Sequence, residues 1–211
     1  MVSKAPNKIA VNSVSLILKA AEALFGQKGY SAVSVTAIAE KAGMSKANVF
    51  HHFGNKKELY FAVIKSAYDD LTGIADEMVR SDRPIAEKLQ AFVKEHLRII
   101  LAKEDMSRLI LRELIDADSE LSEEVTNNIF GDYLSILVEQ IRIGQQQHVI
   151  RDDIEPEAMA LQLVAANVMF VQAKLIFKKI SSIQFPDNVD HFSEVRTDII
   201  LNGILVKGQR D

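Results

Sequence analysis

The chain has 211 residues, of which 48% are hydrophobic and 26% charged, with a formal net charge of -4 and no cysteine. This size and apolar content suffice for one large or two small domains, and the lack of cysteine excludes disulfides and thiol chemistry. No run of about 18 uncharged apolar residues occurs, so we expect no transmembrane helix and no membrane partner. The N-terminus has no apolar signal core, and a cytoplasmic protein is the simplest expectation.

Charge is distributed unevenly along the chain. Residues 1–65 contain nine Lys and three Glu, so this part carries a formal charge of +6 and the remaining residues carry -10. A basic N-terminal part on an acidic body indicates a nucleic-acid-binding surface near one end of the chain. Binding to phosphates through such a surface weakens steeply as salt rises.

The N-terminal part is predicted to contain three helices. Apolar residues recur at helical spacing over about residues 9–27, and two short helices follow at 35–42 and 46–53. Gly43 follows the last apolar residue of the first short helix, where a left-handed conformation is favoured. Ser45 is placed to cap the next helix. The two short helices and the tight turn between them predict a helix-turn-helix.

The two short helices have an apolar face and a polar face. The apolar side chains expected to face inward are Ile38, Ala39, Ala42, Met44, Val49 and Phe53. The outward side chains include no acidic residue and are Lys46, Ala47, Asn48, His51 and His52. An element this short cannot be stable alone, and packing does not explain its outward face. An anionic partner explains it better.

The next helix begins with a capping motif. Asn55 is the predicted N-cap, and Glu58, three residues later, completes a capping box. Lys56 and Lys57 then occupy the first turn, where the helix dipole disfavours cations. Taken alone, these lysines are most simply a solvated pair. Together with the outward face of the preceding helix, they indicate that phosphate lies nearby.

Residues 34–59, with residues 24–30 before them, resemble the DNA-binding domain of the TetR family of transcriptional repressors. The resemblance lies in the ordered apolar, small, Gly, Ser-Lys, aromatic-His and Lys positions. Beyond about residue 70 it is one of architecture only. It implies an all-α fold of about nine helices, in which a three-helix helix-turn-helix DNA-binding domain precedes a larger helical ligand-binding and dimerisation domain.

The resemblance also implies roles for individual residues. The positions that match phosphate contacts are Ser34, His51, His52 and Lys56. The positions that match contacts to base edges or thymine methyls are Thr36, Lys46, Ala47, Asn48 and Phe50, and Ser45 completes the DNA-binding set. The family usually has Tyr where this chain has Phe50 and frequently has Arg where it has Thr36. A phenolic phosphate contact and a common guanine reader are therefore absent, and no operator sequence is implied.

The remaining chain is predicted to be helical throughout. A helix at about 59–80 would run from the DNA-binding part into the acidic body as a lever between them. After the break at residues 81–84, the apolar pattern predicts one helix that carries residues 89–100 and further helices at 106–115, 121–147, 157–180 and 189–206. We therefore predict a DNA-binding domain at 1–57, a ligand-binding and dimerisation domain at 58–211, and a link between them at 58–80.

The last two predicted helices are candidates for a homodimer interface. The segment 157–180 is the most apolar of the chain, with no charged residue between Glu157 and Lys174. A helix that is apolar on nearly all sides must be covered on nearly all sides. We predict that 157–180 and 189–206 of two subunits form a four-helix bundle across a two-fold axis. A palindromic operator also needs two DNA-recognition helices, one from each subunit. Closure of the monomer's own core is the alternative.

A small hydrophobic or amphipathic effector is expected among the C-terminal helices. The candidate lining residues, each of which could equally be plain core, are His96, Ile100, Phe130, Tyr133, Leu137, Asn167 and Phe170. The effector would move the lever helix. This movement would change the spacing of the two recognition helices, one from each subunit, that enter successive major grooves of a palindromic operator. Repression is implied by the resemblance, and the alternative is an activator or a regulator without a small-molecule effector.

Two other classes of protein fit the sequence less well. A helical-bundle enzyme would need features such as Glu-x-x-His pairs or a nucleophile elbow, which the sequence lacks. His51 and His52 are adjacent, so they cannot chelate a metal as an i, i+4 pair would. No catalytic residue, metal or cofactor is therefore predicted. A helical scaffold without a DNA role would leave the basic outward face unexplained.

Overall fold

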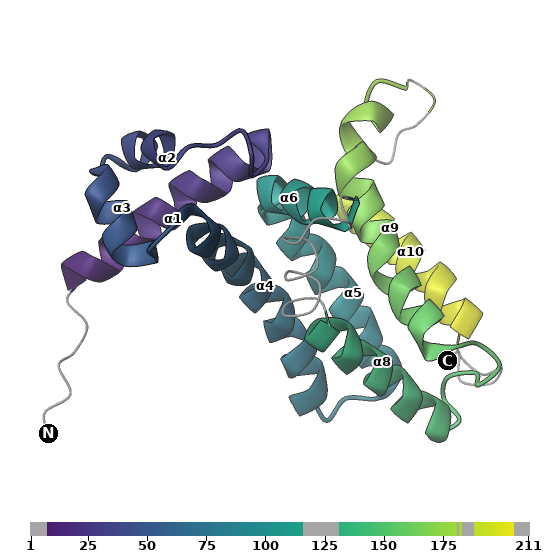
Figure 1. Ribbon diagram of the computed structural model, residues 1–211. Coiled ribbons are helices and arrows are strands. Elements are labelled where there is room, and N and C mark those ends of the chain that lie inside the picture. Colours follow the sequence, from purple (N-terminus) through teal and green to yellow (C-terminus); the bar gives the residue numbers. More distant parts are fainter. Residues whose placement is uncertain (1–7, 116–130, 181, 183–187, 205–211) are drawn as a thin grey trace, which may run out of the picture. The chain divides into compact units, whose positions relative to one another are not determined.

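The computed structural model describes residues 8–115, 131–180, 182 and 188–204, and every regular element in these ranges is a helix (Figure 1). The helices are α1 (Lys8–Lys28), α2 (Val35–Ala42), α3 (Lys46–Phe53), α4 (Lys56–Arg80), α5 (Ile85–Ala102), α6 (Glu104–Ile115), α8 (Gly131–Gln146), α9 (Pro156–Phe177) and α10 (Val189–Ile204). The predicted all-α fold is confirmed, and α2 and α3 have the predicted bounds.

Several predicted bounds differ from the observed ones. α6 begins at Glu104, so Lys103 alone separates it from α5. α9 ends at Phe177, three residues before the predicted end at 180. The first part of the helix predicted at 121–147, including Phe130, and the last two residues of the helix predicted at 189–206 lie outside the described residues.

Contacts within the chain define two compact units. The first unit comprises Met1–Ala67 and Asp105–Val125, and the second comprises Tyr68–Glu104 and Thr126–Asp211. α4 contributes its first part to the first unit and its remainder to the second, and α6 belongs with the N-terminal helices. The division into functional domains at residue 57 remains a proposal.

The first unit is built around an aromatic core. Phe25 and Tyr60 are fully buried, and their ring centroids lie 5.0 Å apart at 90°. The Tyr30 ring lies 4.9 Å from the Tyr60 ring, so α1, α4 and the segment after α1 meet at these rings. α6 adds the fully buried Leu109 to this unit. Ile38 of α2 is also fully buried, which fixes the inner face of the helix-turn-helix.

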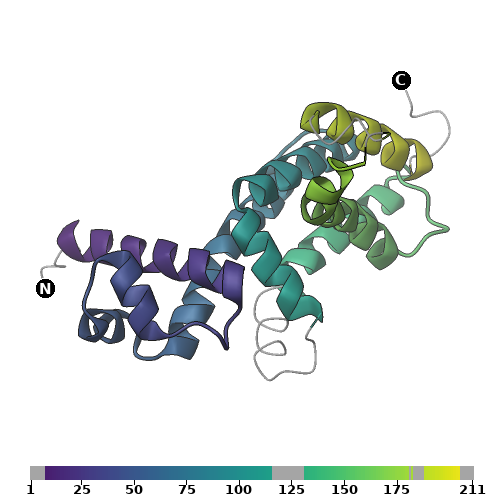
Figure 2. The same ribbon diagram turned by 90° about the horizontal axis from the view of Figure 1, so that it is seen from above.

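The second unit contains α5, α8, α9, α10 and the remainder of α4. α9 packs on both α5 and α8, and α10 packs on α5. Figures 1 and 2 show α9 and α10 side by side, and the rings of Phe170 in α9 and Phe192 in α10 stack 4.1 Å apart at 13°. Leu89, Leu137 and Ile141 are fully buried between the helices. This packing gives α5 neighbours on several sides.

Candidate nucleic-acid interface and ligand pocket

Local hydrogen bonds set the geometry of the helix-turn-helix. Ser34 Oγ accepts from the Ala37 N–H at 3.1 Å and caps α2. Ser45 Oγ accepts from the Asn48 N–H at 3.1 Å and caps α3. Gly43 ends α2 with φ 68°, a left-handed conformation that favours glycine. The predicted caps are therefore confirmed, and α2 and α3 are joined by the three residues 43–45.

The capping motif at the start of α4 is also confirmed. Asn55 Oδ1 accepts from the Glu58 N–H at 2.9 Å, and Asn55 Nδ2 donates to Glu58 Oε1 at 2.7 Å. The carboxylate thus binds the side-chain amide of the cap residue, not its backbone N–H as in the usual capping box. Lys56 Nζ lies 4.2 Å above the Tyr30 ring, and partial burial lowers the pKa of Lys56. Two lysines, Lys56 and Lys57, begin α4.

The first unit brings together the residues assigned to DNA. The exposed ones are Ser34, Thr36, Ser45, Lys46, Ala47, Phe50 and His51, and the half-buried ones are Asn48, His52 and Lys56. Val35, Ile38, Ala39 and Val49 are buried on the opposite side of the same two helices. Of the other side chains predicted to face inward, Ala42, Met44 and Phe53 are half-buried. The separation into a packed face and an available face is therefore as the sequence pattern indicates.

Three side chains of α3, those of Lys46, Asn48 and Phe50, have atoms that remain available to a partner. Asn48 Oδ1 is buried and has no hydrogen-bond partner among the residues that the structure describes. Lys46 Nζ lies 5.7 Å from the centroid of the Phe50 ring, which is 39% exposed. The carboxamide oxygen of Asn48 is therefore uncommitted, and an ammonium group and an apolar ring lie close to each other on the exposed face of the helix.

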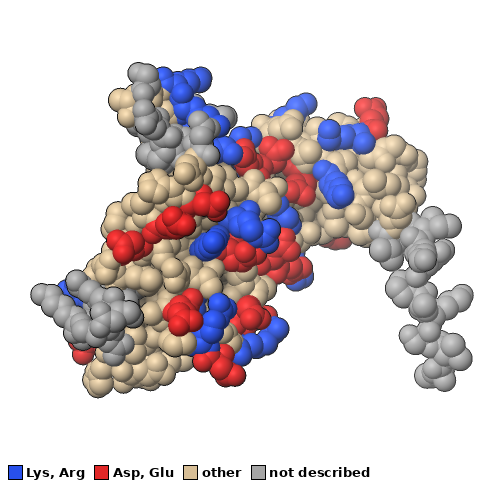
Figure 3. All heavy atoms as spheres, turned by 180° about the vertical axis from the view of Figure 1, so that it is seen from behind, with Lys and Arg blue, Asp and Glu red and all other residues tan. Residues whose placement is uncertain are grey.

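The charge pattern of the second unit is different. Ion pairs join Arg142 to Glu157 at 2.5 Å and Lys103 to Asp70 at 2.5 Å. Figure 3 shows mixed clusters of acidic and basic side chains with uncharged surface between them on one face of the molecule. α3 differs because it has basic and neutral residues only. Its positive charge is not balanced within the helix itself.

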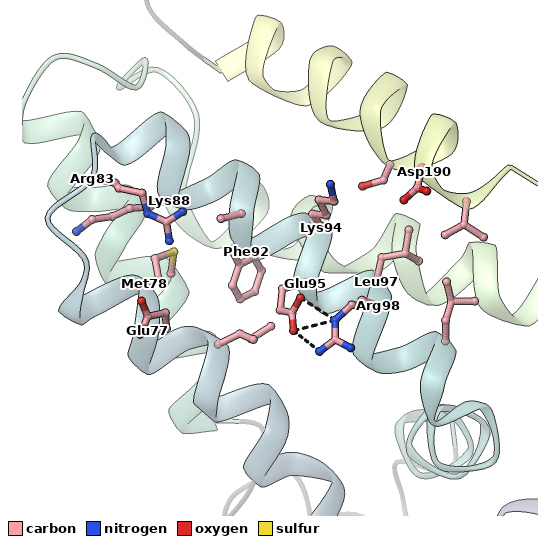
Figure 4. A pocket seen from close by; sticks show the side chains of 15 residues that line it. Glu77, Met78, Arg83, Lys88, Phe92, Lys94, Glu95, Leu97, Arg98 and Asp190 are labelled. Atoms are coloured by element: carbon pink, nitrogen blue, oxygen red, sulfur yellow. Dashed lines mark hydrogen bonds and ion pairs between the residues drawn. The ribbon is translucent and has the colours of Figure 1, made fainter.

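A pocket of about 450 Å³ lies in the second unit between α4, α5 and α10 (Figure 4). Its apolar lining residues are Ile74, Met78, Ala91, Phe92, Leu97, Leu101 and Val189. Its polar and charged lining residues are Glu77, Arg83, Lys88, Lys94, Glu95, Arg98, Asp190 and Ser193. The volume is within the range of small-molecule sites, and the mixture of an apolar lining with a few charges suits a ligand that has both characters.

The charged residues of the pocket are not all paired with one another. Glu95 accepts from Arg98 Nε at 2.9 and 3.0 Å, and this hydrogen bonding lowers the pKa of Glu95. Figure 4 shows Arg83 and Lys88 near each other at one end of the pocket, and Phe92 pointing into it. Arg83 Nε donates to Ser81 Oγ at 3.0 Å, a neutral acceptor. Four cations and three carboxylates line the pocket, so its lining has a small excess of positive charge.

The residues that the sequence suggested for the effector lie elsewhere in the second unit. His96, Ile100, Tyr133, Leu137, Asn167 and Phe170 are all buried, and none of them lines this pocket. Phe130 lies outside the described residues. The pocket residues had no distinctive sequence signal, because most are ordinary exposed or amphipathic helix positions that meet only when α10 packs on α5. The assignment of the seven residues to an effector stays a prediction.

A buried polar cluster joins three helices of the second unit, α5, α9 and α10. We define this cluster as His96, Asn167 and Arg196. Asn167 Nδ2 lies 3.0 Å from His96 Nδ1, and Arg196 Nη1 donates to Asn167 Oδ1 at 2.8 Å. Arg196 Nη2 also donates to the backbone oxygens of Gln162, at 3.1 Å, and Leu163. The cluster therefore connects α5, α9 and α10 through side chains that are at most 6% exposed.

The protonation state of His96 follows from this geometry. An amide nitrogen only donates, so His96 Nδ1 must accept and carry no proton. Burial, with a smaller effect from Arg196, lowers the pKa of His96 to about 3. Burial also lowers the pKa of Arg196, to about 10, so the guanidinium keeps its charge at neutral pH. The cluster thus contains a single charge.

The outer faces of α9 and α10 expose large apolar side chains. Leu161, Met169 and Ile176 of α9 are 58%, 64% and 61% exposed, and Val195 and Ile199 of α10 are 43% and 66% exposed. On each helix these residues recur at spacings that bring them to one side. Exposed apolar surface of this kind is typical of protein interfaces.

Metal sites and membrane-spanning helices are two other features that the described residues could contain. Within the described ranges, no group of three or more His, Cys, Asp or Glu side chains is placed to hold a metal ion. Among the described helices, none combines the length and the apolar character needed to cross a membrane.

The two parts of the sequence match two models of one family. Residues 17–63 match the model of bacterial regulatory proteins of the tetR family, and residues 69–178 match the model of the C-terminal region of YsiA-like proteins. The helix-turn-helix and the helical body therefore define a class of transcription factor, and the chain belongs to the TetR family of transcriptional regulators. The resemblance seen in the sequence is confirmed. Proteins of this family are DNA-binding regulators that dimerise, and not enzymes.

Individual relatives include a transcriptional activator and a transcriptional repressor. The chain is 29% identical over 109 residues to the transcriptional activator FasR of Mycolicibacterium smegmatis, a match that covers 52% of this chain and only 50% of FasR. It is 26% identical over 149 residues to the transcriptional repressor KstR2 of Rhodococcus jostii, with coverage of 67% and 69%. The fold is similar to that of the fatty acid degradation regulator FadR of Bacillus halodurans, with a TM-score of 0.73, 18% identity and coverage of 90% and 98%.

Proposed function

We propose that this regulator is a homodimeric repressor that binds a palindromic operator and is released from it by a small hydrophobic or amphipathic effector. The observation that carries the proposal is the capped helix-turn-helix, in which α3 packs through Val49 and exposes a face without acidic residues. Two copies of α3 would enter successive major grooves about 34 Å apart.

The DNA-binding residues fall into two groups in this proposal. The residues that would contact phosphates are Ser34, His51, His52 and Lys56. Those that would approach base edges or thymine methyls are Thr36, Lys46, Ala47, Asn48 and Phe50, and Ser45 lies at the start of the same helix. Side chains on phosphates fix the register of the protein, whereas contacts to base edges carry the sequence preference.

The second copy of the chain would bind at α9 and α10. Met169 and Ile199, which are 64% and 66% exposed, belong to the apolar stripes of these helices. Two such helices from each subunit would make a four-helix bundle across a two-fold axis. The alternative, in which these helices only close the monomer's core, is less favourable because it leaves the stripes in water.

The pocket between α4, α5 and α10 is the proposed effector site. The apolar side chains of Phe92 and Leu97 suit an apolar chain or ring, and Arg83 and Lys88 suit an anionic group at one end. The name of the similar fold FadR, a fatty acid degradation regulator, supports an apolar effector. The buried residues suggested from the sequence are the second choice, because none of them lines this pocket.

Helix α4 would carry the response to the operator. It runs without interruption from Lys56 to Arg80 and lines the pocket with Ile74 and Met78. An effector can release DNA only to the extent that it binds the DNA-incompetent state more tightly than the competent one. A shift of α4 that changes the spacing of the two readers would supply that difference.

DNA footprinting upstream of the protein's own gene, in rising salt, tests the proposal. We expect two protected half-sites with two-fold symmetry and an affinity that falls by about 10³ or more between about 50 and 200 mM salt. A monomer without salt-sensitive binding to any duplex would refute it. Activation is the second candidate, because the relative FasR is named an activator. A reporter whose expression drops when the regulator gene is deleted would favour activation.

A further inference from the structure

The pocket and the buried polar cluster share a wall. The Phe92 side chain lines the pocket, and its ring stacks on the His96 ring with centroids 5.9 Å apart and an angle of 7°. Ser193 of α10 also lines the pocket and lies one turn before Arg196. Two of the three helices that line the pocket, α5 and α10, are therefore also connected by the cluster.

The connection passes through a single residue of α9. Asn167 is fully buried, and its Nδ2 donates to Val93 O at 2.9 Å as well as to His96 Nδ1 at 3.0 Å. Its Oδ1 accepts from Arg196 at 2.8 Å. Asn167 thus binds α5 with one end of its amide and α10 with the other. Any movement of α10 away from α5 must lengthen or break this series of bonds.

The buried guanidinium of Arg196 is unusual for a contact that only stabilises the fold. Arg196 is 6% exposed, and within the described residues all its acceptors are neutral and its buried Nε has no hydrogen-bond partner. No carboxylate of the described residues forms an ion pair with it. A buried cation without a counterion is costly, and apolar residues of similar volume often serve stability as well or better. What the arginine provides is a bond geometry that fixes α10 on α9.

We propose that the buried polar cluster is a latch that holds α10 against α5 and sets the free energy needed to widen the pocket for a ligand. Arg196 is the positioning residue of this latch and does not contact the ligand. The inference rests on the proposed function, in that the pocket is the effector site. It adds a regulatory element to that site, because two members of the latch belong to α9 and α10, the helices proposed to hold the second subunit.

The latch has a definite consequence for binding. If the pocket must widen before a long ligand enters, the apparent affinity is reduced by the fraction of molecules that are open. Removal of the latch raises that fraction, so the ligand binds more tightly although no contact with it has been added. A side chain that only stabilised the fold would not improve ligand binding when lost.

The test uses 11-(dansylamino)undecanoate, a fluorescent probe with an apolar chain and a carboxylate, and the full-length protein. Titrations compare the wild type with Arg196→Met, Asn167→Leu and the double variant. We expect each single variant to bind the probe about threefold to tenfold more tightly, since a minor open state becomes more populated. The double variant should match the single variants, because both changes break the same latch. Unchanged affinity, or effects that add, would overturn the latch.

Three controls make the result specific. Arg142→Met removes an exposed arginine of the same unit and should leave the probe affinity unchanged. Ala91→Trp fills the pocket and should abolish the gain in the Arg196→Met background; a gain that persists would mean that the probe enters a loosened core, and would also overturn the latch. If Arg196→Met does not fold, as judged by circular dichroism, Arg196→Lys replaces it. A lysine keeps the charge but cannot reach all the acceptors of the guanidinium, so it should shift the affinity in the same direction.

The operator assay separates this inference from the function on which it rests. A wild-type protein that shows no salt-sensitive operator binding would refute the proposed function, whatever the probe does. Intact operator binding, with equal probe affinity in the wild type and Arg196→Met, would refute only the latch.

Discussion

A Cβ atom on Gly26 would lie 2.5 Å from the backbone carbonyl oxygen of Asp105. Real Cβ atoms do not approach a backbone atom so closely, so the first turn of α6 can rest on α1 only because residue 26 has no side chain. Gly26 is buried, and both residues belong to the first unit. Within the first unit, α6 is therefore placed against α1 by a contact between its backbone and a glycine.

We expect Gly26→Ala to destabilise the first unit by about 1–3 kcal/mol, the usual cost of overpacking, because α6 must move. Thermal or urea unfolding measures the change. Gly73→Ala is the matched control: Gly73 is exposed within α4 and has no atom near its missing Cβ, so alanine should stabilise by about 0.5–1 kcal/mol. Equal effects of the two changes would contradict the close-contact explanation.

The double change Lys46→Ala and Asn48→Ala should abolish the preference for the operator over random duplex DNA. Both side chains belong to α3, and neither Lys46 nor the Oδ1 atom of Asn48 is needed for internal packing. Loss of base contacts removes about 1–3 kcal/mol of discrimination for each good pair. Fluorescence anisotropy with both duplexes measures the ratio, and sedimentation checks that the dimer persists. Lys179→Ala, an exposed lysine of the second unit, should keep full preference.

Met169→Glu should dissociate the dimer without unfolding the subunit. The side chain is 64% exposed, so a carboxylate is well solvated in the monomer but would be buried beside its symmetry mate in the proposed interface. Analytical ultracentrifugation should show monomers at concentrations where the wild type is dimeric. Val79→Glu introduces the same charge at a 51% exposed apolar residue of α4 and should leave the dimer intact. A dimeric Met169→Glu protein would place the interface elsewhere.

Stability should fall as the pH drops from about 6.5 toward 4, because of His96. Burial lowers the pKa of His96 in the folded state to about 3, below its value of about 6.5 in the unfolded chain. Between these two values the unfolded state binds more protons, so acid favours unfolding, and the contribution is fully present above pH 6.5. The slope from this one group is at most about 1.4 kcal/mol per pH unit.

Denaturant unfolding at several pH values measures this slope. His96→Gln keeps an acceptor for Asn167 and removes the titrating group, so its stability should depend less on pH than that of the wild type. His191→Gln changes an exposed histidine of α10 and should retain the wild-type slope. If the two variants have the same slope, His96 is not the group that titrates.

The helix-turn-helix was predictable to the residue because its signals are local. Ser34, Ser45 and Asn55 each cap a helix through a hydrogen bond that spans three residues, and Gly43 ends α2 within the same short stretch. Such bonds depend on neighbours in the sequence and not on the rest of the fold. The exposed face of α3 followed from the same spacing. The phosphate and base roles themselves came from the family resemblance.

The pocket and the buried polar cluster were not predictable in this way. Phe92 and Ser193 are about a hundred residues apart in the chain and meet only because α10 packs on α5. His96 and Asn167 were predicted to line an effector site, but no spacing pointed to Arg196 as their partner. The approach of α6 to Gly26 is a long-range contact of the same kind.

The sequence by itself determined the class of fold, the bounds of the two reader helices, the face that they leave available and the family. Caps, glycine conformation and the helical repeat act over a few residues, and they have the same effect in any tertiary context. Tertiary structure alone decided which helices enclose a pocket, which buried polar groups find each other and which glycine must lack a side chain. Those outcomes depend on the docking of surfaces that are distant in the chain, and no local pattern encodes the contact.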